Sequence, residues 1–152
     1  MVAACASAAL LAACGSSTTE SAISPQRMIA FGDGMSDVGQ KGTRYTVNDG
    51  SVNNWTLQVA SGYGKTLTAS SAGGKSYAAG NARIVAKPDA AGSNTTLTVK
   101  EQIDSFLASN TLTGDDLVMI NGGISDVIAN MAAVNAGTMT TEQMITASRQ
   151  AG

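Results

Sequence analysis

The stretch RMIAFGDG, residues 27–34, is a short apolar run that stops at a glycine and an aspartate. A run of this length that ends in a glycine turn is typical of a buried parallel strand. The stretch LVMINGG, residues 117–123, repeats the pattern later in the chain. We therefore predict two adjacent parallel strands, at Arg27–Phe31 and Leu117–Asn121, each followed by a sharp glycine-rich turn.

Helical patterns lie between these strands. Residues 55–63 carry a weak one, and residues 75–84 are rich in Gly and Ala, which predicts irregular chain with a little strand. The clearest helix is predicted at residues 99–109. Thr98 and Glu101 have the spacing of a capping box, in which each side chain bonds a backbone N–H at the helix start. Four apolar side chains fall on one face of this helix: Val99, Ile103, Phe106 and Leu107.

Two more helices are predicted after the second strand. Residues 126–134 place an apolar stripe on the inner side, and Thr140 and Gln143 form a second capping box that opens a helix running to the end of the sequence. Strands that alternate with helices in this order indicate an α/β layered domain with a parallel sheet. The stripe of the first of these helices comprises Val127, Ile128, Met131 and Val134.

Both predicted strands end in turns that carry an acid, at residues 32–34 and 122–126. In open α/β sheets ligands bind at the carboxyl ends of the strands, so the two turns would face one crevice. Alternatively, each is simply a tight strand-to-helix turn, for which Gly and Asp are routine. The pattern alone leaves both interpretations open.

Composition excludes several classes of function. The 152 residues are 43% hydrophobic and 13% charged, so a packed core is expected rather than disorder. The net charge is −2 and Lys and Arg do not cluster, which gives no electrostatic support for binding nucleic acid or an anionic membrane. The sequence contains no histidine, the commonest general base and metal ligand. We expect no metal and no cofactor.

The N-terminal residues 1–13 form an apolar, alanine-rich run that is too short to span a bilayer and is typical of a secretory signal. The run ends in LAAC, which resembles a bacterial lipobox and implies lipidation of Cys14. Alternatively, Cys5 and Cys14 are merely small residues in an apolar leader. Since both cysteines lie in or at the end of the leader, a disulfide within the mature domain is excluded.

This interpretation divides the chain into three parts. They are a signal peptide at 1–13, a Ser/Thr-rich flexible tether at 14–25 and a partial domain at 26–152. The expected location is the cell envelope, through the lipid anchor, or outside the cell. The lipid anchor would be the chain's one link to a membrane.

Three blocks in order resemble the GDSL/SGNH hydrolases, a family of esterases and lipases. FGDGMSDVG, residues 31–39, is similar to the first block, which usually reads FGDSLSD-x-G. SYAAGNAR, residues 76–83, resembles the second block, and LVMINGGISD, residues 117–126, resembles the third, which ends G-x-N-D. The resemblance implies a flavodoxin-like three-layer α/β/α fold with a parallel sheet.

The resemblance also implies a mechanism in which a Ser attacks an ester carbonyl, with a His as base and an Asp that orients it. An oxyanion hole would use the N–H of the nucleophile residue, an N–H of the second block and an Asn side chain of the third. The matching positions are Gly34, Gly80 and Ser125. Gly34 therefore stands at the nucleophile position without a side chain, and Ser125 replaces the amide.

Other block residues match supporting positions rather than the catalytic triad. Asp33, Asp37 and Asp126 match motif acids, and Ser36 matches a non-nucleophilic Ser. The D-x-x-H block and every His are missing, so we expect no catalysis from this chain. The expected ligand is a small ester or another acylated compound.

The predicted last helix, from Thr140 to Gly152, lacks stop signals, and the family's fold has further strands after the third block. We therefore expect a fragment of a larger domain, with the C-terminal strands and helices missing. Two other hypotheses stay open. The chain is either a pseudoenzyme that holds an ester or an acetylated glycan, or a structural surface lipoprotein without a ligand.

Overall fold

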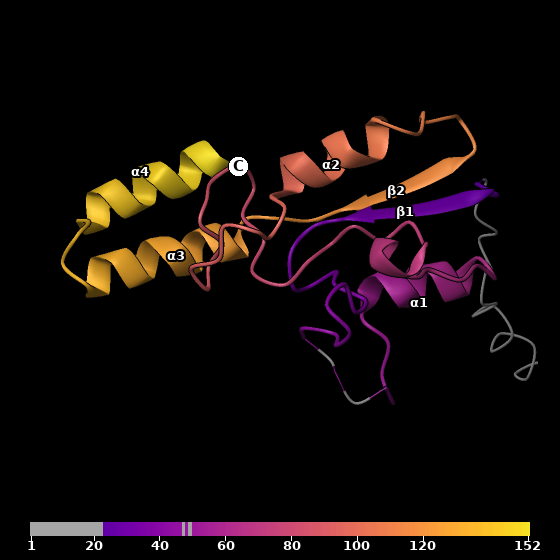
Figure 1. Cartoon of the computed structure of the whole chain (residues 1–152), viewed down its shortest axis with the longest axis horizontal. Coiled ribbons are helices and arrows are strands. Elements are labelled where there is room, and N and C mark those ends of the chain that lie inside the picture. The colour runs from indigo at the N-terminus through magenta and orange to yellow at the C-terminus, as the bar shows by residue number, and fades with distance from the viewer. Residues whose placement is uncertain (1–22, 47, 49) are drawn as a thin grey trace, which may run out of the picture.

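The computed structural model describes residues 23–46, 48 and 50–152 and has a mixed α/β architecture (Figure 1). The signal at 1–13, Cys14 and the tether up to residue 22 lie outside the described residues. Within the described ranges, no helix is long and apolar enough to cross a bilayer. The elements in chain order are β1 (Arg27–Phe31), α1 (Trp55–Gly62), the 3₁₀ turn η1 (Ser70–Ala72), α2 (Val99–Leu107), β2 (Asp116–Ile120), α3 (Ile124–Asn135) and α4 (Thr141–Ala151).

The two strands pair in parallel, which confirms the sequence prediction. Arg27 lies opposite Asp116 and Phe31 lies opposite Ile120, so β2 begins one residue earlier than predicted. The Arg27 guanidinium donates to both carboxylate oxygens of Asp116, from Nε and from Nη2, each at 2.6 Å. A two-pronged ion pair at the first position of both strands helps to set their register.

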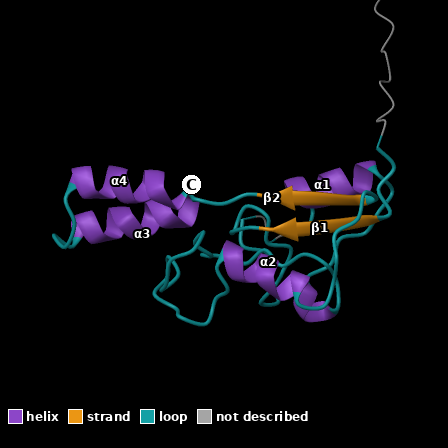
Figure 2. Ribbon diagram, turned by 90° about the horizontal axis from the view of Figure 1, so that it is seen from above, coloured by secondary structure: helices purple, strands orange, loops and turns teal. Residues whose placement is uncertain are grey.

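β1 is covered on both faces, and α1 and α2 lie on opposite sides of the strands (Figures 1 and 2). On the α2 side, the rings of Phe31, Tyr77 and Phe106 meet with centroids 5.7 to 5.9 Å apart. The α1 face buries Met28, Ala30, Ala60, Leu67 and Met119, and the α2 face buries Ile29, Phe31, Val99 and Phe106.

The outer edge of β1 is occupied by the chain around Ser76. The Tyr77 N–H donates to the Ala30 carbonyl at 2.7 Å, and the Ala30 N–H donates to the Lys75 carbonyl at 3.0 Å. Only isolated bridges form here, which confirms the irregular character predicted for residues 75–84. β1 is therefore flanked on both edges, by β2 and by this segment.

Both predicted capping boxes are confirmed. Thr98 accepts from the Glu101 N–H at 3.2 Å, and Glu101 accepts from the Thr98 N–H at 2.8 Å. Thr140 and Gln143 form the same pair of bonds at the start of α4. The box depends on residues three apart in sequence, which is why it was readable without the fold.

The predicted inner faces of two helices are partly wrong. In α2, Leu107 is 48% exposed, whereas Gln102 is completely buried. In α3, Ile128 and Met131 of the predicted inner stripe are 49% and 50% exposed. The α3–α4 pair extends beyond the carboxyl ends of the strands (Figure 2), and α4 packs against α3 without burying these two side chains.

Gln102 is buried because its amide completes the hydrogen bonding of β1. Its Oε1 accepts from the Gly32 N–H at 2.8 Å, and its Nε2 donates to the Gly32 carbonyl at 3.0 Å. Nε2 also donates to the Leu97 carbonyl at 3.2 Å. Buried backbone groups need hydrogen-bond partners. At Gly32, the first residue after β1, the Gln102 side chain supplies a partner for the N–H and one for the carbonyl.

We expect Gln102→Leu to lower the free energy of unfolding by about 2–4 kcal/mol, because it removes the side-chain partners of the Gly32 N–H and the Leu97 carbonyl. The Gly32 carbonyl keeps its bond from the Ala79 N–H. Urea unfolding followed by circular dichroism measures the change. Gln58→Leu, the same replacement on the exposed side of α1, is the control and should stay within about 0.5 kcal/mol. Equal effects of the two substitutions would show that the Gln102 bonds contribute nothing specific.

The ion pair between the strands predicts a pH dependence. The Arg27 guanidinium, with help from the Thr113 N–H, lowers the pKa of Asp116 from 3.8 to about 2, although burial opposes the shift. A carboxyl whose pKa is lowered by folding adds stability above its unfolded pKa, and this stability is lost as the pH falls toward the folded value. Asp116 therefore stabilises the fold fully above about pH 4 and loses this effect toward about pH 2.

We expect Asp116→Asn to be less stable than the native chain near neutral pH, with the difference shrinking as the pH falls from about 4 to about 2. Unfolding free energies measured in urea across this range test the expectation. Asp104→Asn, which removes an exposed partner of Lys100 on α2, should change stability little at any pH. A gap between native chain and Asp116→Asn that stays constant down to about pH 2 would contradict this assignment.

Candidate functional site

The turns that follow the two strands meet at Gly32 and Asn121. A Cβ added to Gly32 would lie 2.0 Å from Asn121 Oδ1 and 2.9 Å from the Asn121 carbonyl, and the Gly32 φ is +150°. Only glycine combines this φ with so close an approach. The carboxyl ends of β1 and β2 are therefore held in direct contact.

A buried hydrogen-bond network joins the first and third blocks. Asn121 Nδ2 donates to Asp33 Oδ1 at 2.6 Å, and the Ser36 hydroxyl donates to Asn121 Oδ1 in a very short bond. Trp55 Nε1 donates to the Ser36 oxygen at 3.0 Å. Ser36 has no exposed surface, so its hydroxyl is both engaged and inaccessible to a substrate.

The first block is also joined to the second, through Asp37. One carboxylate oxygen of Asp37 accepts from the N–H groups of Gly39 and Gln40, both at 2.8 Å. The other accepts from the Gly80 N–H at 2.7 Å. The Gly80 N–H is thus engaged by Asp37 in this structure, and an oxyanion could use it only by taking the place of that carboxylate.

Gly34 and Gly80 lie on either side of one aromatic ring, that of Tyr45. A Cβ on Gly34 would be 2.5 Å from Tyr45 Cδ1, and a Cβ on Gly80 would be 2.2 Å from Tyr45 Cδ2. The Tyr45 hydroxyl donates to Asn81 Oδ1 at 2.6 Å. Two of the three positions expected in an oxyanion hole are therefore brought together at one ring. We call the space that this ring fills between Gly34 and Gly80 the glycine recess.

The third position, Ser125, lies in the first turn of α3 and is 3% exposed. Its neighbour Asp126 accepts from Arg83 Nε at 3.0 Å and from the Ile84 N–H at 2.8 Å. These bonds join the third block to the end of the second block. The atoms nearest to the glycine recess belong to Tyr45, whose hydroxyl is bonded to Asn81.

The acids around the glycine recess bond to the backbone. Asp33, Asp37 and Asp126 all accept from backbone N–H groups, which is what supporting acids of tight turns do. No histidine exists in the sequence to activate a hydroxyl. Among the described residues, no group of three or more His, Cys, Asp or Glu side chains could hold a metal ion.

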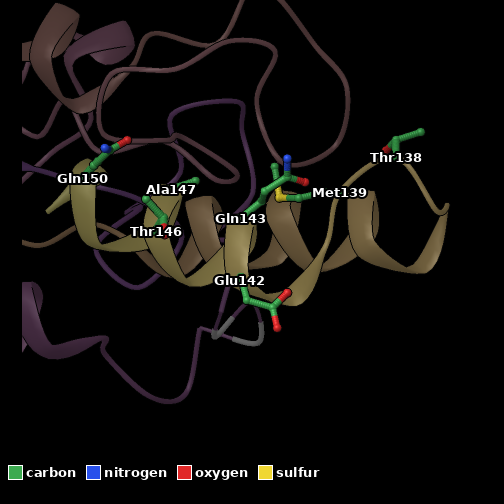
Figure 3. Close-up of a pocket in the computed structure, with 7 residues that line it drawn as sticks. All are labelled: Thr138, Met139, Glu142, Gln143, Thr146, Ala147 and Gln150. Carbon is green, nitrogen blue, oxygen red and sulfur yellow. The ribbon is translucent and has the colours of Figure 1, made fainter.

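A second hollow lies on the outer face of α4 and the turn before it, with a volume of about 460 Å³ (Figure 3). Glu142 is the one ionisable side chain among its lining residues. It has neither a nucleophile paired with a base nor a contact with the three blocks, so it is the weaker candidate. Its lining residues are Thr138, Met139, Glu142, Gln143, Thr146, Ala147 and Gln150.

Sequence reasoning missed three residues of the site. Asn121 could have been found, because it follows β2 at the same place where Gly32 follows β1. Tyr45 is a lone aromatic residue in a polar loop, which is a weak signal. Trp55 begins a segment with only a weak helical pattern, and that pattern does not show that its indole N–H bonds Ser36.

Comparisons with protein-family models, with curated proteins and with solved structures found no match to this chain.

Proposed function

We propose that this chain is a GDSL/SGNH-type ester-hydrolase domain that binds a small ester or acylated ligand without cleaving it. The observation that carries the proposal is the glycine recess. Gly34 of the first block and Gly80 of the second block are far apart in sequence, yet they bound the same space. An oxyanion site built from the two blocks requires this proximity, and its ligand would replace Asp37 at the Gly80 N–H.

The strand arrangement supports the same proposal. The first and third blocks follow two adjacent parallel strands, and their turns meet at Gly32 and Asn121. Helices on both sides of β1 are compatible with the three-layer α/β/α fold, which we propose for this domain. Ligand binding at the carboxyl ends of parallel strands is the general rule for such sheets.

Absence of cleavage follows from the groups at the recess. Gly34 has no side chain that could attack a carbonyl, and no histidine is present to act as base. Ser36 is completely buried and bonded to Asn121 and Trp55. A hydroxyl held in this way is neither accessible nor activated.

We expect the purified chain to hydrolyse p-nitrophenyl acetate no faster than buffer, and Gly34→Ser alone to leave this unchanged, because a serine without its base is a weak nucleophile. The new Cβ would also meet the Tyr45 ring. Activity should require Ser at 34, a C-terminal extension with D-x-x-H and, from the family resemblance, Asn at 125.

Gly114→Ser is the control for the added hydroxyl, since Gly114 has open space around it. Saturable turnover by the native chain that disappears in Ser36→Ala would show that Ser36 is the nucleophile. Turnover that appears with Gly34→Ser alone would show that a group other than His acts as the base.

We further propose that the chain is a lipoprotein of the cell envelope, on the basis of the LAAC run that ends at Cys14. Mass spectrometry of the protein from a bacterial membrane fraction should find acylated Cys14 as the mature N-terminus. Cys14→Ser should abolish acylation, whereas Cys5→Ser should not, because Cys5 lies within the leader. An unmodified peptide that spans Ala13 and Cys14 would refute the proposal.

A further inference from the structure

Tyr45 covers the glycine recess without belonging to the core. The residue is 57% exposed and lies in the loop between β1 and α1, whereas Gly34 and Gly80 beneath its ring are buried. One side of the recess is therefore closed by a side chain that remains largely in contact with solvent. Core aromatic residues of this chain, such as Phe106, are completely buried.

The fit between ring and recess depends on the absence of two side chains. Added Cβ atoms would lie 2.5 Å from the ring at Gly34 and 2.2 Å from it at Gly80. Carbon atoms in contact are about 3.5–4.0 Å apart, so a side chain at either position would expel the ring. The recess thus accommodates a flat ring, and Asn81 Oδ1 accepts from the hydroxyl that this ring carries.

Among the described residues, two hydrogen bonds join the segment that carries Tyr45 to the first and second blocks, and Arg44 bonds only within its own loop, to Asn48 and Val52. The Tyr45 hydroxyl donates to Asn81, and the Thr46 hydroxyl donates to the Gly34 carbonyl at 3.1 Å. Gly39 and Gly42, which precede the segment, have φ values of +116° and +91°. Exposed segments with few buried contacts open at low cost, and glycines commonly absorb the change in backbone angles.

We propose that Tyr45 is a displaceable occupant of the glycine recess, and that a ligand enters by replacing its ring with a flat group of its own. This inference rests on the proposed function, because it concerns how the same site is regulated. The ring competes with the ligand. The apparent affinity of the native chain is therefore reduced by the fraction of molecules in which the recess is closed.

The position of the ring can be tested without a ligand, by ¹⁹F NMR of protein that contains 3-fluorotyrosine. The chain has three tyrosines, and Tyr45→Phe identifies the Tyr45 signal by removing it. Gly34→Ala and Gly80→Ala should both move this signal to the position of a freely exposed tyrosine. Gly114→Ala, whose Cβ meets nothing within 4 Å, should leave it in place. An unmoved signal in Gly34→Ala and Gly80→Ala would overturn the inference.

Competition with a ligand can be tested by NMR titration with phenyl acetate, a flat aromatic ester. Tyr45→Ala should bind it about tenfold more tightly than the native chain, because the recess is then open in every molecule. Tyr45→Phe, which keeps the ring and loses the bond to Asn81, should fall between the two. Tyr45 lies on an exposed loop, so these variants should fold normally.

The outcomes separate the inference from the proposed function. Binding by the native chain and by Tyr45→Ala with equal affinity would overturn the inference and leave the proposed function standing. Weaker binding by Tyr45→Ala would show that the ring contributes to the site, which also overturns the inference. Failure of every variant to bind would overturn both.

Discussion

The structure depends on the tight fixation of one backbone unit, that of Gly32. The Gln102 amide bonds both its N–H and its carbonyl, and Asn121 approaches from β2 so closely that no side chain fits. These contacts hold α2, β1 and β2 at a single point. The turns of the first and third blocks start there, and the second block bonds to the same unit through the Ala79 N–H, so the geometry of the candidate site follows from this contact.

The acids around this point act on the backbone. Asp33, Asp37 and Asp126 each accept from N–H groups of turns, and Asp37 and Asp126 reach across to the second block. A carboxylate that accepts from backbone N–H groups in this way stabilises a loop, and it is poorly placed to orient a base. The three blocks therefore form one rigid polar frame, and the glycine recess lies on its surface.

The two ends of the fold differ in how completely their apolar surface is buried. β1 is covered on both faces and flanked on both edges. In β2, Val118 and Ile120 remain 38% and 55% exposed, because α2 covers the side of the sheet above β1 and does not reach over them. The apolar stripe of α3, which contains Ile128 and Met131, is similarly uncovered. The stable centre of the chain is therefore β1 with its two helices, whereas the α3–α4 pair extends beyond it (Figure 1).

The sequence by itself determined the features that depend on near neighbours. The two strands, their glycine turns and the capping boxes at Thr98 and Thr140 were all readable, because each is set by residues within a few positions of one another. The family blocks pointed to Gly34 and Gly80 as a pair. That pairing is a matter of resemblance, and the structure supplies the geometry around it.

Only the tertiary structure decided which partners those local elements meet. Gln102 looked like a polar residue of an amphipathic helix, and its bonds to Gly32 span 70 positions of the chain. Tyr45 belongs to no periodic pattern in the sequence. Its contacts come from two distant glycines that the fold places on either side of its ring. The sequence shows the apolar stripe of α3, but the prediction that it is buried is wrong for Ile128 and Met131. Periodicity tells which face of a helix is apolar, and burial depends on whether another element is there to cover it.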